Sequence, residues 1–374
     1  MSVSMYSRFT EGSIDGFGSV KETSTQNFLD NHYDNSTPYR KKTCKELLAK
    51  HWQWVFFSAI SSICFAVSNY LIGKSSHEGF FIRPFIMVGN LIVAVIFILY
   101  YYCVKSGSLQ GLLCDFQLIH LEFSGVNYHM LLDISIDAIL LIGGEYLLIF
   151  TFHQSLRATI NQGVISSLFV LSSVITAIIS WVMVKIRTRV NPIHSNYFNF
   201  LQRERCNRYH AICAILVGCS FFILTEIPAM YYQSDLIHTI FILTILTSLY
   251  FSAKDMLFKA RIIKYFLSPH KLYSLIICLG GIFMLITSAV LVSIYGFSQI
   301  VWDSFIAGIL QSCAIFSMIF SLMRETKGWT PLIISYCFII HALLAMWFLE
   351  QWLDWIQIIV LVLTSICVCI TCVG

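Results

Sequence analysis

The chain has 374 residues, of which 57% are hydrophobic and only 12% are charged, and its net charge is +4. Soluble domains carry roughly 25% charged residues, so this composition leaves too little polar surface for a water-soluble globule of this size. The high hydrophobicity excludes general disorder, and the small net charge gives no indication of a nucleic-acid partner. What remains is a polytopic membrane protein whose surroundings are a lipid bilayer.

Residues 1–51 form a polar region that precedes every apolar segment. Ser, Thr, Asn, Asp and Gly dominate as far as Tyr39, and a basic cluster follows at Arg40, Lys41, Lys42, Lys45 and Lys50. A stretch of this composition cannot bury enough apolar surface to fold alone. We therefore predict a disordered tail whose basic cluster lies beside the membrane.

Ten apolar segments follow the tail, and each is predicted to be a membrane-spanning helix. A span needs about 20 mostly apolar residues, and over runs this continuous only helices satisfy the backbone polar groups in lipid. The segments are 52–72, 81–104, 131–152, 160–186, 211–226, 236–258, 272–296, 303–323, 330–350 and 354–373. The fifth is short for a span. The predicted fold class is therefore all-α, with ten transmembrane helices.

The placement of lysine and arginine predicts the orientation. With a cytoplasmic N-terminus, all but three of the 24 lysines and arginines fall on the cytoplasmic side, and the three exceptions are Lys74, Arg83 and Arg157. Cytoplasmic loops of membrane proteins carry an excess of these residues. We therefore expect an integral membrane protein with both termini in the cytoplasm, in either the plasma membrane or an endomembrane.

Ten helices divide into two halves of five, 52–226 and 236–373. An odd number of helices in the first half makes the second half enter the membrane upside down, which is the inverted repeat of many secondary transporters. The segment from Asn161 to Met183 can be laid over the one that ends at Leu349, with Trp181 on Trp347. Chance similarity between two apolar helices is the alternative explanation.

This layout resembles the drug/metabolite transporter superfamily in its EamA-like form. The third and eighth segments carry the resemblance, from Glu145 to Ser155 and from Asp303 to Ser317, each followed by a further apolar helix. Glu350 fits the acidic residue that this family has after the fourth helix of a repeat. Val184, next to Lys185, occupies the matching position in the first half and departs from the pattern.

The resemblance implies alternating access around a central cavity lined mainly by helices one, three, four, six, eight and nine. The sequence from Ser180-Trp181 to Ile186-Arg187 is also similar to the nucleotide-sugar and triose-phosphate branch, so the branch stays open. The aromatic residues Tyr146, Tyr250 and Trp347 are candidates for cavity walls, with lipid-facing or packed positions as the alternative.

Glu145 is the leading candidate for a site residue. It lies well inside the third segment, after Gly143 and Gly144, which permit close approach of another helix. A charge at the bilayer centre costs roughly 2.5–3.5 kcal/mol even on permissive scales, so the carboxylate should face a cavity or a partner. It would either bind solute or carry a proton, or it would be a protonated group hydrogen-bonded to a neighbouring helix.

The other candidates are Tyr146, Asn69, Lys254, Gln311 and His341. His341 could relay protons or be a packed core histidine. Gln311, Asn69 and the less favoured Asn90 could line a cavity or join helices through their amides. The ammonium group of Lys254 is expected to extend to the cytoplasmic membrane surface. Asp255 is expected to pair with Lys259, one turn later, and not with the adjacent Lys254.

Asp133 and Asp137 lie one turn apart at the inner end of the third segment. Like charges at this spacing repel. We therefore expect both carboxylates to be solvated at the membrane interface.

The predicted function is that of a secondary transporter for a small organic solute. The alternative is a non-transporting scaffold or receptor-like subunit on the same fold. The sequence contains no nucleotide-binding, zinc-protease or nucleophile-elbow motif, so we expect no enzyme activity and no cofactor. Most of the 13 cysteines lie in apolar runs as small hydrophobic residues, and no metal site is predicted. A homodimer is left open.

Overall fold

The computed structural model describes residues 44–108, 111–113, 116, 118, 127–190, 208–226, 234–265, 267–324 and 330–373. Nearly all of these residues are helical, and no strand occurs among them. The predicted tail as far as Thr43 and most of the polar loop at 187–210 lie outside the described residues. The first helix begins at Cys44, within the range assigned to the tail.

The helices follow one another along the chain as predicted from the apolar segments. In the first half they are α2 (Cys44–Ser75), η2 (Ser76–Ile82), α3 (Arg83–Tyr101), η3 (Tyr102–Ser106), α5 (Tyr128–Arg157), α6 (Gln162–Leu168), α7 (Leu171–Val190) and α9 (Arg208–Glu226). In the second half they are α10 (Ser234–Tyr265), α11 (Pro269–Tyr295), α12 (Gln299–Arg324), α13 (Thr330–Ser335), α14 (Cys337–Phe348) and α15 (Trp355–Val373).

Seven of these helical stretches are long and apolar enough to cross a membrane. They are Trp52–Ser75, Arg83–Val104, Tyr128–Arg157, Gln162–Ile179, Leu236–Ile262, Pro269–Ile294 and Gln299–Met323. Three further apolar helices, Ala211–Leu224, Leu332–Phe348 and Trp355–Ile370, are shorter. The length and composition of these helices are consistent with an integral membrane protein, and a total of ten spans stays a prediction.

Two segments that the sequence predicted as continuous helices are interrupted. The fourth breaks at Phe169 and Val170, between α6 and α7, and the ninth breaks at Tyr336, between α13 and α14. Tyr336 follows Val170 at the same spacing as Trp347 follows Trp181. The first break is a tightened turn, because the amide of Val170 donates to the carbonyl of Ser167 at 3.2 Å.

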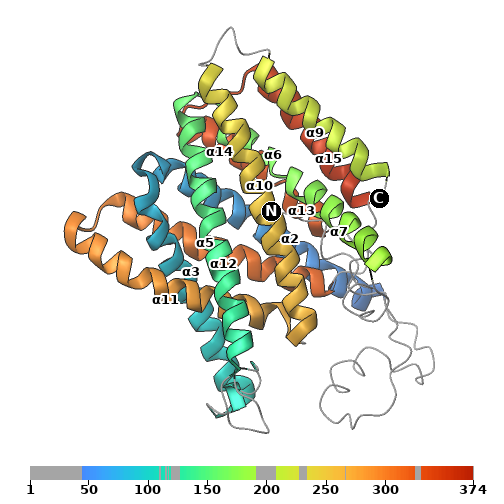
Figure 1. The fold of residues 1–374 in the computed structure, drawn as a ribbon. Coiled ribbons are helices and arrows are strands. Elements are labelled where there is room, and N and C mark those ends of the chain that lie inside the picture. The colour runs from blue at the N-terminus through green and yellow to red at the C-terminus, as the bar shows by residue number, and fades with distance from the viewer. Residues whose placement is uncertain are drawn as a thin grey trace.

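Two antiparallel helix pairs organise the bundle: α2 packs along α12, and α5 packs along α10 (Figure 1). Around them, α3 packs on both α11 and α12, α5 on α11, α6 on α14, and α9 on α15 (Figure 1). In addition, α2 packs on α14 and α10 packs on α7. The segments that contact most closely therefore come from different halves of the chain.

Serine hydrogen bonds join α2 to α12 along most of their length. Ser61 Oγ donates to the carbonyl of Ala314 at 2.8 Å, and Ser68 Oγ donates to the carbonyl of Ala307 at 2.9 Å. Lipid supplies no hydrophobic driving force between helices, so association depends on close packing and on polar contacts of this kind.

Glycines bring the backbones of α3 and α12 into contact. A Cβ added at Gly89 would lie 2.2 Å from the carbonyl oxygen of Phe305, and one added at Gly308 would lie 2.0 Å from that of Ile86. Neither position has room for a side chain without moving a helix.

We expect Gly308→Ala to destabilise the protein by roughly 1–3 kcal/mol, because the added methyl group meets backbone that cannot rotate away. Gly218→Ala is the matched control, since nothing lies within 4 Å of its added Cβ and alanine favours helix by roughly 0.5–1 kcal/mol. Melting in detergent measures both. Equal melting temperatures for the two variants would contradict the close contact.

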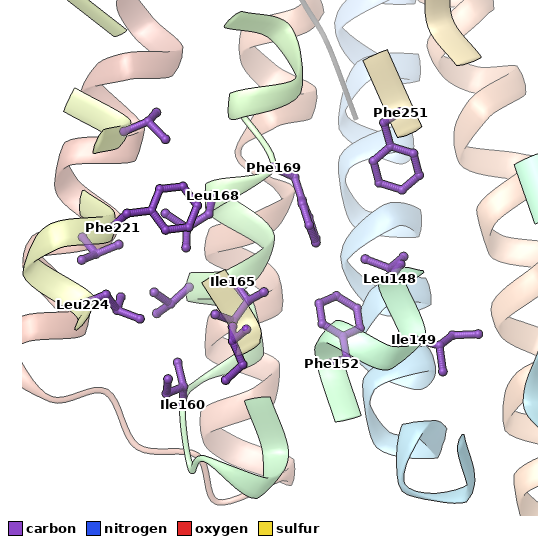
Figure 2. Close-up of a cluster of buried hydrophobic side chains, with 14 of the residues drawn as sticks. Leu148, Ile149, Phe152, Ile160, Ile165, Leu168, Phe169, Phe221, Leu224 and Phe251 are labelled. Atoms are coloured by element: carbon purple, nitrogen blue, oxygen red, sulfur yellow. The ribbon is translucent and has the colours of Figure 1, made fainter. Parts of the chain in front are cut away.

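The largest buried apolar cluster surrounds the break between α6 and α7. Phe169 at the break lies edge-on to Phe251 of α10, with ring centroids 6.0 Å apart, and 6.4 Å from Phe152 of α5. Figure 2 shows these rings together with Leu148, Ile165 and Phe221 in one cluster. The interruption is therefore held in place by packing between helices of both halves.

Candidate functional site

An ion pair lies in the interior of the bundle, between α3 and α5. Arg83 is the first residue of α3, followed by Pro84 at a position where helices tolerate proline. Its side chain is 0% exposed, and Nη1 contacts Oε2 of Glu145, which is 3% exposed. Each charge makes the burial of the other tolerable, because an isolated ion at this depth would be costly.

Amide and hydroxyl groups extend this pair onto α12. Gln311 Nε2 donates to Glu145 Oε1 at 3.2 Å, and Asn90 Nδ2 of α3 donates to Gln311 Oε1 at 3.1 Å. Ser312 Oγ then donates to Asn90 Oδ1 at 2.8 Å. We call these five residues the charge network. It joins two helices of the first half to one of the second.

Arg83 has more donors than the network uses. A guanidinium carries five N–H groups in a fixed fork. Within the part of the chain that the structure describes, nothing accepts a hydrogen bond from Nε or Nη2 of Arg83. Buried donors are normally satisfied, and leaving one unpaired costs roughly 1–3 kcal/mol or more for a charged group. The surplus donors are therefore a candidate contact for a bound group.

The sequence identified part of this network. Glu145 and Gln311 were predicted site residues, and the structure brings them together. Arg83 was counted only among the basic residues on the non-cytoplasmic side, and its complete burial was not predicted. Asn90 was ranked below the other amides yet is central. The signal for Arg83 was available: one arginine at the start of an apolar helix and one glutamate inside another.

The glycines before Glu145 do what the sequence predicted. A Cβ added at Gly143 would lie 3.0 Å from the ring of Tyr250, and one at Gly144 would lie 3.2 Å from the ring of Phe251. Both rings belong to α10, so the glycines let α10 approach α5 beside the charge network. Thr151 and Thr247 meet across the same interface at 3.3 Å.

His341 lies apart from the charge network, where α6 crosses α14. Its Nδ1 is 2.8 Å from Ser166 Oγ, and its ring lies edge-on to Phe152 at 5.5 Å. The side chain is completely buried. At the same crossing, a Cβ added at Gly163 would lie 2.3 Å from Cα of Ala342. Close packing therefore surrounds this histidine on both helices.

An amide network closes the end of the bundle next to this crossing. Asn161 Nδ2 donates to the carbonyl of Gln351 at 2.7 Å, and the amide of Gln162 donates to Gln351 Oε1 at 3.2 Å. Gln357 Oε1 accepts from the amide of Asn161 at 3.1 Å. This network was not predicted from the sequence, because its members are far apart along the chain.

The remaining predicted residues lie outside the charge network. Asn69 of α2 and Tyr146 of α5 are half-buried. Lys254 of α10 is also half-buried, with Nζ 3.8 Å from Asp255 Oδ1 and 5.6 Å above the ring of Phe251. The expectation that the adjacent residues Lys254 and Asp255 would not face each other was therefore wrong, because the long lysine side chain bends toward the carboxylate of Asp255.

Of the suggested aromatic walls, Trp347 is 75% exposed and so faces away from the bundle. That exposure contradicts a place in a central cavity. Tyr250 is 39% exposed and covers Gly143. The aromatic contribution to the interior comes instead from phenylalanines such as Phe152 and Phe251.

Asp133 and Asp137 are not solvated as the sequence suggested; they are 8% and 1% exposed. Asp133 is 2.8 Å from Lys264 Nζ and 2.9 Å from Arg261 Nη2, and it accepts a hydrogen bond from the Tyr265 hydroxyl at 2.6 Å. The three partners belong to α10, which the sequence could not place beside α5. The hydrogen bond to Asp133 raises the pKa of Lys264, which lies beyond the membrane-spanning part of α10.

A second lysine–aspartate pair joins α2 to α12. Lys74 Nζ is 2.8 Å from Asp303 Oδ2, and Gln299 Nε2 donates to Asp303 Oδ1 at 3.0 Å. This pair lies near the C-terminal end of α5, because Gln162 Nε2 donates to the carbonyls of both Gly73 and Phe152. At 1.5 Å per helical residue, Phe152 is about 28 Å from Asp133. The two pairs are thus at opposite ends of the bundle.

Among the described residues, no group of three or more His, Cys, Asp and Glu side chains could hold a metal ion. In comparisons of the sequence, no protein-family model and no curated protein matches this chain.

Proposed function

We propose that this protein is a secondary transporter of the drug/metabolite transporter type, which moves a small organic solute by alternating access. The observation that carries the proposal is the pair of lysine–aspartate contacts, Lys74–Asp303 and Lys264–Asp133, one at each end of the bundle. A protein that must close each face of a membrane in turn needs one such contact per face.

The two contacts occupy equivalent places when the halves are exchanged. Lys74 and Lys264 are each the next-to-last residue of a 32-residue helix, α2 and α10. Asp303 and Asp133 each lie in the second turn of the helix that packs antiparallel to it. Both Nζ–Oδ2 distances are 2.8 Å. An inverted repeat would produce this equivalence, and chance would have to match helix, position and partner.

Part of the remaining packing supports the same relation. If the halves are exchanged, α2 corresponds to α10, α3 to α11, α5 to α12 and α7 to α14. The contact between α2 and α12 then corresponds to the one between α10 and α5, that between α3 and α12 to the one between α11 and α5, and that between α2 and α14 to the one between α10 and α7. The interruptions at Val170 and Tyr336 also correspond. Discontinuous helices at matching places in two repeats are typical of secondary transporters, whose solute sites lie near them.

The strength of the lysine–aspartate contacts suits a gate. The side chains of Lys74 and Lys264 are 41% and 47% exposed, so each pair contributes little, up to about 1 kcal/mol. Contacts this weak can break and re-form during transport, whereas the fully buried Arg83–Glu145 pair cannot separate without a substitute partner. In the proposed cycle one gate opens while the other stays closed, with the charge network between them.

The test is flux in proteoliposomes that contain the purified protein. We expect a preloaded solute to drive uptake of the same labelled solute, which is counterflow and requires a binding site that alternates between faces. The panel should include organic acids, phosphate esters, sugars, amines and amino acids. Counterflow for one chemical class supports transport. If the folded protein gives no counterflow with any class, the scaffold alternative replaces this proposal.

A further inference from the structure

We propose that Arg83 and Glu145 form a proton-coupled binding site for an organic oxyanion, in which a carboxylate or phosphate of the solute replaces Glu145 at Arg83 while Glu145 takes up a proton. This inference rests on the proposed transport function and names its substrate class. It starts from the two donors of Arg83, Nε and Nη2, that no described residue accepts from.

The guanidinium favours an oxyanion over other ligands. Its fork of N–H groups matches the two oxygens of a carboxylate or phosphate and can bind them in bidentate fashion. Arg83 is completely buried at the first turn of α3, so such a bond would form away from competing water. A cation would meet repulsion from the same group.

Glu145 decides when the anion can bind. As a carboxylate in contact with Arg83, it neutralises the guanidinium and repels a second negative charge. Once protonated at Oε2, it becomes neutral and can donate a hydrogen bond to the arriving anion. Its Oε1 can still accept from Gln311 Nε2, which is 3.2 Å away. The amide therefore holds the side chain in place in both protonation states.

Charge balance fixes the stoichiometry. The empty site holds one positive guanidinium and one negative carboxylate, so it is neutral. With a singly charged solute bound, it holds the guanidinium, the neutral acid and the anion, and it is neutral again. The proton comes from the solution on the side from which the anion enters, and it leaves with the anion on the other side. A buried site tolerates this exchange because its net charge does not change.

The surroundings of Glu145 leave Arg83 as the dominant charge. Among the described residues, the charged and titratable groups on neighbouring elements that interact electrostatically with Glu145 are Arg83 on α3, Lys254 on α10 and Tyr273 on α11. Lys254 is itself paired with Asp255. The group presented by α12 is the uncharged Gln311.

The experiment measures thermal stabilisation of the purified full-length protein in detergent by matched probes. Benzoate is compared with benzamide, and inorganic phosphate is compared with a buffer of equal ionic strength that contains no oxyanion. Binding to the folded state raises the melting temperature by mass action. We expect the acid, and not its amide, to stabilise. Its apparent affinity should fall about tenfold per pH unit above the titration of Glu145, as uptake of one proton requires.

Two conservative variants complete the test. Glu145→Gln mimics the protonated acid, so anion binding should lose its pH dependence. Arg83→Lys keeps the charge but not the fork, so binding should weaken at least tenfold. Equal stabilisation by acid and amide, no stabilisation by any anion, or pH-independent binding to the unaltered protein would each overturn the inference, and these three readouts need no variant to fold.

The outcomes separate this inference from the proposed function. Anions that bind with the expected pH dependence but show no counterflow would leave the site standing and reject transport. Counterflow of a neutral or cationic solute that Arg83→Lys leaves unchanged would support transport and reject the anion site.

Discussion

Asp303→Asn and Asp133→Asn should open opposite ends of the protein. Each substitution keeps the shape of the side chain and removes the charge that holds one lysine, Lys74 or Lys264. A hydrogen bond to a charged group contributes roughly 1.5–3 kcal/mol when buried, and the exposure of both lysines reduces this. We therefore expect each variant to shift the balance between open and closed states at its own end by up to about fivefold, which corresponds to about 1 kcal/mol.

Hydrogen–deuterium exchange of backbone amides measures this shift, and it needs no probe attached to the protein. Asp303→Asn should speed exchange where α2 ends and α12 begins, and leave the start of α5 unchanged. Asp133→Asn should do the reverse, so each variant is the control for the other. Exchanging the charges in the double variant Lys74→Asp with Asp303→Lys should restore the slow rate. Faster exchange at the same end in both variants would reject the gate assignment.

Glu145→Leu should be among the most destabilising single substitutions in the protein. It leaves the guanidinium of Arg83 buried without its counter-charge. Removing one partner of a buried pair typically costs roughly 3–5 kcal/mol, whereas replacing both by apolar groups is often neutral or stabilising. We therefore expect the double variant Arg83→Met with Glu145→Leu to recover most of the lost melting temperature.

Lys254→Met provides the control for this measurement. Lys254 is also a charged residue within a membrane-spanning helix, but it is half-buried and paired at 3.8 Å, so its removal should cost less than about 1 kcal/mol. The double variant further separates structure from function, because it should fold well and yet fail to bind organic acids. A double variant as unstable as Glu145→Leu would show that the pair is not coupled.

The sequence predicted the helical segments well because run length and hydropathy are local properties. Each predicted segment is helical, and the short fifth segment corresponds to the short apolar helix Ala211–Leu224. The interruption at Phe169 was not predictable in this way. Neither Phe169 nor Val170 is a helix breaker, and the break is held by rings on α5 and α10 that lie far away along the chain.

The candidate site was half predictable for a similar reason. Glu145 and Gln311 are polar residues within apolar runs, so their cost in lipid marks them in the sequence. Arg83 lies at the edge of an apolar segment, where an arginine is usually solvated, and only its contact with Glu145 shows otherwise. Asp133 was misjudged likewise, since its partners on α10 become neighbours only through the antiparallel packing of α5 and α10.

The contact of Gly89 with the α12 backbone divides α12 into two lever arms of unequal length. Gly308 lies five residues from Asp303 and sixteen from the end of α12 at Arg324, so the arms measure about 7.5 Å and about 24 Å at 1.5 Å per residue. If α12 tilts about this contact, its far end at Arg324 moves roughly three times as far as Asp303 does. Parting Asp303 from Lys74 by 1 Å, roughly a third of a hydrogen-bond length, would therefore swing the far end of α12 by about 3 Å in the opposite sense.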